Sequence, residues 1–174
     1  KKYDFIVVGA GPCGLLSASI LTKKGSCLVI EEGHLIDSSQ KNHYSFKQIQ
    51  EGYRDGGFNM VFGLPKIFLS EGCCIGGGSI VNSSLHHRAP DSVWNLWRTE
   101  YNLVGFEKKD IDNAYQKIET DFATDCGNSI ESNFYKTASK KFSVKRIPRW
   151  GEGNSLGDFR RKTAYDAYEN TISE

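Results

Sequence analysis

The first apolar run of the chain ends in a cluster of glycines, and this feature restricts the fold more than any other. Residues 5–8, FIVV, have no polar alternation, which is typical of a buried parallel strand. The glycine-rich turn GAGPCG at 9–14 follows at once, and residues 12–24 have the composition of a helix. A strand, a glycine turn and a helix in this order predict an α/β fold that begins with a βαβ unit.

Each residue of this turn has its own expected task. Gly9 permits a tight turn after the strand, Gly11 lets the backbone approach a pyrophosphate, and Gly14 lets the helix pack closely on the strand. Pro12 opens the helix, whose N-terminus has unpaired N–H groups and the positive end of the helix dipole. Gly25 is expected to end the helix. The turn therefore predicts a site for the phosphates of a dinucleotide.

A second strand is expected at 26–30, and the acid that follows it completes the motif. Glu31 stands where a carboxylate accepts hydrogen bonds from an adenosine ribose. Glu32 is adjacent, but the alternation of side chains along a strand turns it to the opposite side. A carboxylate at this point repels a 2′-phosphate, so the ligand is FAD or NAD rather than NADP. The alternative, a glycine turn without a ligand, leaves the agreement of strand, turn, helix and acid unexplained.

A second glycine-rich stretch lies at 72–82, GCCIGGGSIVN. Its glycines, followed by Ser79 and Asn82, predict a backbone that comes close to a planar or anionic ligand and offers N–H donors to it. A mobile glycine loop is the alternative. The apolar Ile80 and Val81 anchor the stretch, and this favours ligand binding.

Together the two stretches resemble the glucose-methanol-choline (GMC) family of FAD-dependent oxidoreductases. The family's first signature fits residues 72–82 position by position, and Ala89 and Asn95 fit its later positions, whereas His86 stands where an aromatic residue or alanine is usual. The resemblance is specific at 3–33 and 72–90 and looser from 91 to 174.

The resemblance implies that the first turn and Glu31 bind the adenosine diphosphate end of FAD and that the second stretch lies along the isoalloxazine ring. Val81 occupies a position where some relatives carry a histidine bonded covalently to the flavin, so dissociable FAD is expected. The implied cofactor-binding residues are Gly9, Gly11, Pro12, Gly14, Glu31, Gly77, Gly78, Ser79 and Asn82.

The implied reaction is the oxidation of an alcohol to a carbonyl compound by hydride transfer to the flavin, which oxygen or another acceptor then reoxidises. The family's catalytic histidine comes from a later segment, so the catalytic residues are not identified among these 174 residues, and the segment alone is expected to be inactive. His86 and His87 follow the flavin loop and could face the substrate, but packing or surface exposure is favoured. For Arg88 an ion pair is favoured over substrate contact.

The chain is expected to divide at residue 90. Residues 1–90 would form the first part of the FAD-binding domain, and 91–174 a mostly helical or irregular cover leading into a substrate domain. Helices are expected at 45–51 and 110–121, and an extended arm at 58–69. Because a doubly wound sheet needs further βα units that are not recognised after residue 90, the Rossmann-like core is expected to be incomplete and to be completed by the remainder of the polypeptide.

Composition narrows the function classes. The 22 basic and 21 acidic residues give a net charge of +1, which argues against a nucleic-acid partner. The apolar runs have strand length, so no membrane span is expected. Five cysteines without C-x-x-C spacing predict reduced thiols and a cytoplasmic location. The neighbours Cys73 and Cys74 are expected to be structural rather than redox-active, and no metal site is expected.

Three functions compete at this point. An FAD-dependent alcohol oxidase or dehydrogenase accounts for both glycine stretches. An NAD-dependent dehydrogenase accounts for the first stretch and leaves 72–82 unexplained. A non-catalytic dinucleotide-binding module would keep the binding site without the chemistry, and a flavin-containing lyase or isomerase is a further alternative. The alcohol, the electron acceptor and the oligomeric state are not predicted.

Overall fold

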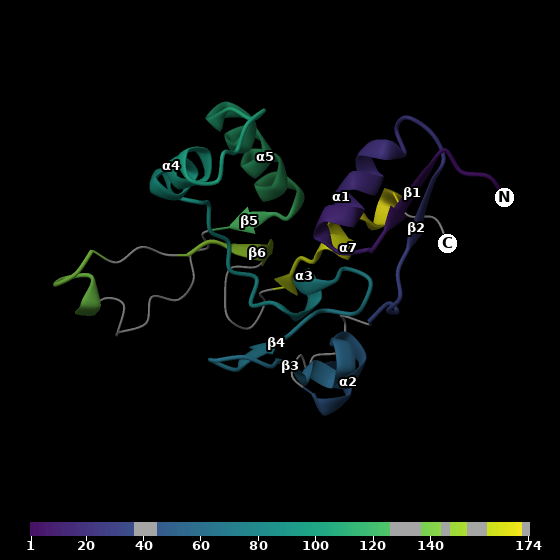
Figure 1. Cartoon of the computed structure of the whole chain (residues 1–174), viewed down its shortest axis with the longest axis horizontal. Helices are drawn as coiled ribbons and strands as arrows, with labels where there is room; N and C mark the ends of the chain where they lie inside the picture. Colours follow the sequence, from purple (N-terminus) through teal and green to yellow (C-terminus); the bar gives the residue numbers. More distant parts are fainter. Residues whose placement is uncertain (37–44, 126–136, 144–146, 153–159, 172–174) are drawn as a thin grey trace. The chain divides into compact units, whose positions relative to one another are not determined.

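A computed structural model of the chain describes residues 1–36, 45–125, 137–143, 147–152 and 160–171. These residues belong to two compact units (Figure 1). The first unit comprises Lys1–Ser83 and Thr163–Glu174, and the second comprises Ser84–Lys162. The predicted division into an FAD-binding part at 1–90 and a cover region at 91–174 stays a prediction.

The first unit begins with the predicted βαβ arrangement. Strand β1 (Phe5–Val8) leads through the glycine turn into helix α1 (Pro12–Leu21), which returns the chain to strand β2 (Cys27–Ile30). The two strands pair in parallel from Phe5↔Cys27 to Val8↔Ile30. This arrangement is confirmed, and it brings the end of β1, the start of α1 and the end of β2 to one edge of the sheet.

Three details differ from the prediction. Strand β1 is not buried on both faces, because Ile6 is 62% and Val8 82% exposed and, in the described part of the chain, β2 alone pairs with it. Helix α1 ends at Leu21 rather than at residue 24. Gly25 does not act as a left-handed cap; a Cβ on it would lie 2.8 Å from the carboxylate of Asp4, so close approach accounts for this glycine.

Helix α2 (Phe46–Gly52) and a hairpin follow in the first unit. The hydroxyl of Ser45 accepts a hydrogen bond from the backbone N–H of Gln48 and thereby caps α2, which confirms the predicted helix. After the 3₁₀ turn η1 (Arg54–Gly57), strands β3 (Asn59–Val61) and β4 (Ile67–Leu69) pair antiparallel. The predicted extended arm is therefore a β-hairpin, and most of its apolar side chains are exposed.

The second glycine-rich stretch returns the chain to β2 and ends in the short helix α3 (Gly78–Val81). Cys74 forms a parallel bridge with His34, just beyond β2. The buried side chain of Cys74 forms a small core with Ile36 and Ile80, and Val81 packs against this core. The stretch is thus anchored on both sides, as its apolar end predicted.

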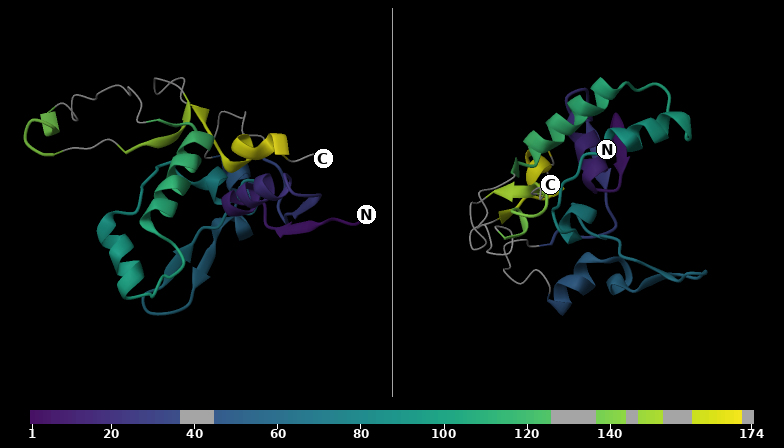
Figure 2. Two further views of the ribbon diagram at one scale, coloured as in Figure 1. Left: turned by 90° about the horizontal axis from the view of Figure 1, so that it is seen from above. Right: turned by 90° about the vertical axis from the view of Figure 1, so that its left-hand side faces the viewer.

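Helix α7 (Ala164–Tyr168) and the 3₁₀ turn η2 (Glu169–Thr171) bring the chain back to the first unit. Helix α7 packs against α1, and Figure 2 shows the yellow α7 beside the purple α1. Leu15 and Ala18 of α1 and Ala164 and Tyr168 of α7 are buried. The first glycine turn and the second glycine stretch therefore share a unit with a segment from the end of the described chain.

The second unit contains helix α4 (Asp91–Thr99), helix α5 (Lys108–Asp121) and a small sheet. Helix α5 confirms the predicted helix and begins two residues earlier, behind a capping box between Glu107 and Asp110. Strands β5 (Thr124–Asp125), β6 (Arg149–Glu152) and β7 (Arg160–Arg161) form an antiparallel sheet in that order. This sheet was not predicted, because strands of two to four residues are too short to show alternation.

The described residues thus combine helices with small sheets, as expected for an incomplete Rossmann-like core. None of the helices in the described ranges has the length and apolar character needed to cross a bilayer. Cys126 lies outside these ranges, and the four cysteines within them are free thiols.

Candidate functional site

Two glycines of the first turn are required by the chain itself. Gly9 has a φ of +92°, in the left-handed region that favours glycine, and its N–H donates to the carbonyl of Ile30 (N···O 2.7 Å). A Cβ on Gly14 would lie 1.9 Å from the carbonyl oxygen of Gly9. The tight turn and the close packing of helix on strand, both predicted for these glycines, are therefore present.

Gly11 has no such reason within the chain. It is the N-cap residue of α1, with an ordinary φ of −75°, and Pro12 follows in the first turn of the helix. A Cβ built on Gly11 would meet no atom within 4 Å. No side chain of the described residues caps this end of α1, so its N-terminal N–H groups and the positive end of its dipole remain available to an anion.

Glu31 connects the end of β2 to the glycine turn. Its Oε2 accepts a hydrogen bond from the backbone N–H of Ala10 (2.6 Å), and its Oε1 accepts one from the N–H of Gly33 (3.0 Å). Each carboxylate oxygen retains a second lone pair, so the predicted contact with a ribose is compatible with both bonds and stays a prediction. Sequence reasoning had not foreseen either backbone bond.

Glu32 has a different partner. It pairs with Arg54, which also donates from Nε to Glu71 (2.8 Å). The hydrogen bond from Arg54 lowers the pKa of the exposed Glu32 carboxylate. Glu31 thus bonds to the glycine turn whereas Glu32 pairs with Arg54, and this agrees with the preference for Glu31 as the residue near the turn.

The second glycine stretch lies directly against the first turn. The N–H of Gly76 donates to the carbonyl of Ala10 (2.8 Å), and a Cβ on Gly77 would lie 2.9 Å from the Cα of Gly11. Gly76 and Gly77 also have positive φ angles of +99° and +51°. The two stretches, which are separated by about sixty residues in the sequence, therefore form one continuous backbone surface.

Comparing the glycines of this surface identifies where a ligand fits. A positive φ or a clash with the chain explains five of them, whereas Gly11 and Gly78 have an ordinary φ and open space where a Cβ would be. A ligand that needs this space accounts for the absence of both side chains. The five explained glycines are Gly9, Gly14, Gly72, Gly76 and Gly77.

Ser79 and Asn82 are held by the chain's own backbone. The Ser79 hydroxyl, in a residue that is 1% exposed, donates to the carbonyl of Gly76 (2.7 Å) and accepts from the N–H of Ala164 (2.8 Å). The N–H of Asn82 donates to the carbonyl of Gly78 (3.0 Å). The predicted cofactor roles of these residues and of the two glycine stretches remain predictions.

Cys73 and Cys74 lie in the same stretch. Burial raises the pKa of the Cys74 thiol to about 11 and also raises that of Cys73. Because the thiolate is the reactive form, a thiol with a raised pKa is a poor nucleophile at neutral pH. This agrees with the expected structural role.

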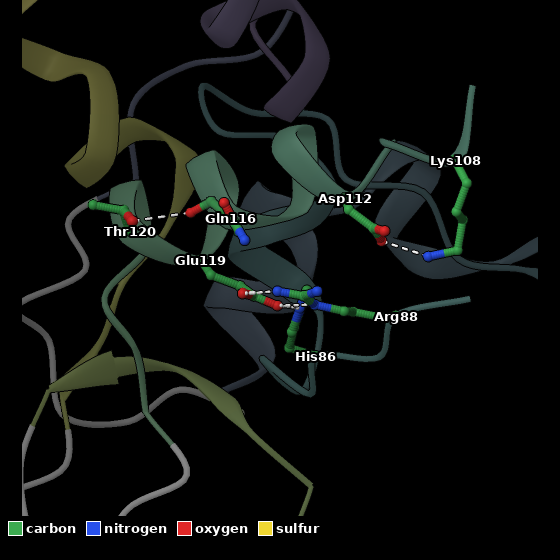
Figure 3. A network of polar contacts seen from close by, with 7 residues as sticks. All are labelled: His86, Arg88, Lys108, Asp112, Gln116, Glu119 and Thr120. Carbon is green, nitrogen blue, oxygen red and sulfur yellow. Dashed lines mark hydrogen bonds and ion pairs between the residues drawn. The ribbon is translucent and has the colours of Figure 1, made fainter. Parts of the chain in front are cut away.

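A separate polar cluster lies in the second unit (Figure 3). His86, which is 7% exposed, has its Nε2 at 2.9 Å from Oε1 of Glu119 on α5. Arg88 donates to the same carboxylate through Nε (2.6 Å) and Nη2. The hydrogen bonds from Arg88 are the largest cause of a Glu119 pKa lowered to about 2. The His86 ring also packs near the rings of Tyr115 and Trp150.

This cluster decides between the roles left open for three residues. His86 is packed and hydrogen-bonded, His87 is exposed, and Arg88 forms an ion pair. These contacts agree with the favoured interpretations, and the absence of a substrate role for the three residues stays a prediction. The partner residue Glu119 was not foreseen, because a contact across 33 residues leaves no local pattern in the sequence.

The comparisons with known proteins place the chain in a family. The family model for GMC oxidoreductases matches residues 3–151. The chain is 30% identical over 118 residues to the uncharacterized GMC-type oxidoreductase y4nJ of Sinorhizobium fredii, a match that covers 67% of this chain and 23% of that protein. It is 28% identical over 159 residues to the long-chain-alcohol oxidase FAO3 of Arabidopsis thaliana, covering 85% of this chain and 20% of that protein.

A third relative is the dehydrogenase str4 of Strobilurus tenacellus, 26% identical over 132 residues, with 68% of this chain and 20% of that protein covered. The chain therefore spans about a fifth of the length of the curated relatives named here. Among solved structures, a formate oxidase of Aspergillus oryzae matches 55% of this chain and 18% of its own, with a TM-score of 0.40 and 15% identity. At that TM-score the sequence comparisons alone carry the family assignment.

Proposed function

The chain belongs to the GMC oxidoreductase family, whose members are flavin-dependent oxidoreductases, and we propose that it forms the FAD-binding part of an enzyme that oxidises an alcohol to a carbonyl compound. One observation carries the proposal. Gly11 and Gly78 leave open space on two adjoining backbone loops, at the uncapped N-terminus of α1. Nucleotide phosphates bind where a helix N-terminus and a glycine-lined backbone meet, and the parallel βαβ unit with Glu31 after β2 favours a dinucleotide.

The roles of the residues follow from this arrangement. In the proposed complex the pyrophosphate lies over Gly11 and accepts hydrogen bonds from the first N–H groups of α1, with Pro12 holding the helix start. Glu31 uses its remaining lone pairs to accept hydrogen bonds from the adenosine ribose. Gly77, Gly78, Ser79 and Asn82 belong to the loop that faces the flavin end, where Gly78 leaves room for the ring. FAD, when bound, supplies the group that accepts a hydride.

We further propose that FAD is bound without a covalent link. Val81 has an aliphatic side chain that packs on the core of Ile36, Cys74 and Ile80, and its carbonyl accepts a hydrogen bond from the Tyr53 hydroxyl (3.2 Å). An aliphatic side chain has no atom that bonds to a flavin. Acid or heat denaturation of the full-length protein should therefore release all of its flavin into solution.

The substrate class is proposed from the relatives. Three relatives in Arabidopsis thaliana are named long-chain-alcohol oxidases, so we propose an alcohol as the substrate and oxygen or another acceptor as the oxidant. His86, which follows the second glycine stretch in the sequence, is buried against Glu119 and is not offered as the base. We assign the base, the walls of the substrate pocket and the cover of the exposed side of β1 to the remainder of the polypeptide.

The proposal is tested on the full-length protein in two steps. Denaturation followed by chromatography identifies the released cofactor; about one FAD per chain supports the proposal, whereas NAD would favour the dehydrogenase alternative and no nucleotide would contradict both. Anaerobic addition of a long-chain alcohol should then bleach the flavin absorbance and yield the aldehyde. Bound FAD that no alcohol reduces would contradict the proposed reaction and leave the cofactor assignment standing.

A further inference from the structure

A single series of hydrogen bonds connects the two glycine loops with a helix from the end of the described chain. The N–H of Ala164 donates to the Ser79 hydroxyl (2.8 Å), and this hydroxyl donates to the carbonyl of Gly76 (2.7 Å). The N–H of Gly76 donates to the carbonyl of Ala10 (2.8 Å), and the N–H of Ala10 donates to Glu31 (2.6 Å). The series therefore runs from α7 through both loops to the acid at the end of β2.

We propose that Ser79 is a positioning residue for the cofactor site: its hydroxyl fixes both glycine loops against α7 and does not bond to the flavin. This inference rests on the proposed FAD-binding function. It differs from the expectation drawn from the family resemblance, in which Ser79 contacts the flavin end directly.

The burial of Ser79 supports this role. The residue is 1% exposed, and its neighbours Ala164 and Thr163 are 0% and 2% exposed. A hydroxyl has one proton to donate, and that proton is used on Gly76. The hydroxyl oxygen also accepts the N–H of Ala164, so the proton and one of the two lone pairs of this hydroxyl are already used within the chain.

Helix α7 is built to present this N–H group. Thr163 is its N-cap, and its hydroxyl accepts a hydrogen bond from the N–H of Asp166 (3.2 Å). The carboxylate of Asp166 accepts one from the N–H of Thr163 (2.8 Å), completing a capping box. Ala164 is the first residue of the helix, where an N–H has no partner within the helix. Ser79 supplies that partner across 85 residues of sequence.

The same series explains how a distant helix affects the ligand site. Both backbone groups of Gly76 are held, its carbonyl by the Ser79 hydroxyl and its N–H by the carbonyl of Ala10. Gly76 has a φ of +99°, a conformation that glycine leaves easily unless such bonds hold it. Gly77 and Gly78 follow directly, so release of the Gly76 backbone would misplace the loop opposite Gly11.

The test compares three variants of the full-length protein. Ser79→Ala removes the hydroxyl and leaves the buried N–H of Ala164 without its partner, whereas Ser79→Thr retains a hydroxyl. Ser19→Ala is the matched control, because Ser19 on α1 is also buried and its hydroxyl donates only within the helix, to the carbonyl of Leu16 (2.7 Å). The readouts are the FAD dissociation constant and the amide hydrogen exchange of the FAD-free protein.

We expect Ser79→Ala to raise the FAD dissociation constant about tenfold, the effect of losing one buried hydrogen-bond partner. In the FAD-free protein it should speed exchange at the amides of Ala164, Gly76 and Ala10. Ser79→Thr should restore most of both properties, and Ser19→Ala should change neither beyond about twofold.

The outcomes separate this inference from the proposed function. A wild-type protein that binds no FAD would overturn both. Wild-type binding that Ser79→Ala leaves unchanged would overturn the positioning role alone. Altered flavin absorbance in Ser79→Ala, with the exchange of Ala164 and Gly76 unchanged, would show a direct bond to the flavin and would also overturn it.

Discussion

Replacing Gly14 with alanine tests whether the close packing of α1 on the glycine turn holds the site together. The added Cβ would lie 1.9 Å from the carbonyl oxygen of Gly9 and 3.1 Å from its carbonyl carbon. Cβ atoms are essentially never found within 3.0 Å of such an atom, so the helix start must move by at least 1.1 Å, the difference between 3.0 and 1.9 Å. The obstacle is backbone, which cannot rotate away as a side chain can.

The energetic cost follows from two opposing terms. Overpacking of this kind costs about 1–3 kcal/mol, and a backbone obstacle places Gly14→Ala at the upper end of that range. Alanine in a helix instead of glycine returns up to about 1 kcal/mol. We therefore expect a net destabilisation of about 2 kcal/mol, measured by urea denaturation of the FAD-free full-length protein with circular dichroism.

The control for this experiment is Gly78→Ala, which adds the same methyl group to a short helix but into open space. Its stability without FAD should lie within about 0.5 kcal/mol of the wild type. If Gly14→Ala were as stable as the wild type, or if both variants lost the same stability, the steric reasoning for the first turn would be refuted.

Three further predictions concern the cofactor and pH. Gly11→Val should abolish flavin retention by placing a side chain in the open space at the start of α1, whereas Cys74→Ser should retain most of the flavin. The amount of bound flavin per chain measures both effects. Equal retention in the two variants would contradict the assignment of Gly11 to the pyrophosphate site. Glu31→Ala should weaken FAD binding about tenfold without preventing folding, since it deletes charge-assisted hydrogen bonds rather than side chains of the apolar core. Binding as tight as in the wild type would contradict the role of Glu31 in holding the ribose. Arg88 lowers the pKa of Glu119 from 4.5 to about 2, so the stabilisation of the fold by this carboxylate should be complete above pH 4.5 and disappear as the pH falls through about 2. The difference in the free energy of unfolding between wild type and Glu119→Gln should therefore narrow in that window. A difference independent of pH would contradict this prediction.

The βαβ unit was predictable because its signals are local. An uninterrupted apolar run, glycines at fixed spacing and an acid after the second strand all depend on neighbours in the sequence, and each has a separate physical reason. Helix α2 and the start of α5 also carry their caps within a few residues, at Ser45 and Glu107. Such elements need no knowledge of the tertiary structure.

The long-range contacts of the glycine loops and of the separate polar cluster were not predictable in this way. Gly76 meets Ala10, Ser79 meets Ala164 and His86 meets Glu119 across long stretches of sequence. A side chain that pairs with a distant backbone N–H leaves no periodic pattern, so Ser79 was expected to face a ligand. The resemblance to the family located the loop but did not reveal which of its groups the chain already uses.

The burial of the β1 side chains was overestimated for a related reason. A continuous apolar run indicates burial in the complete sheet, but Ile6 and Val8 are exposed when β2 alone is paired with β1 in the described part of the chain. Sequence patterns report the environment of the finished fold, whereas exposure depends on which strands are present.

The central claim is that one FAD molecule lies across both glycine loops at once. Amide hydrogen exchange of the full-length protein, followed by mass spectrometry with and without FAD, tests it most directly. We predict that FAD slows exchange in peptides covering residues 9–14 and 72–82 together, at the same FAD concentration. Protection of one segment without the other, or of neither, would contradict the claim.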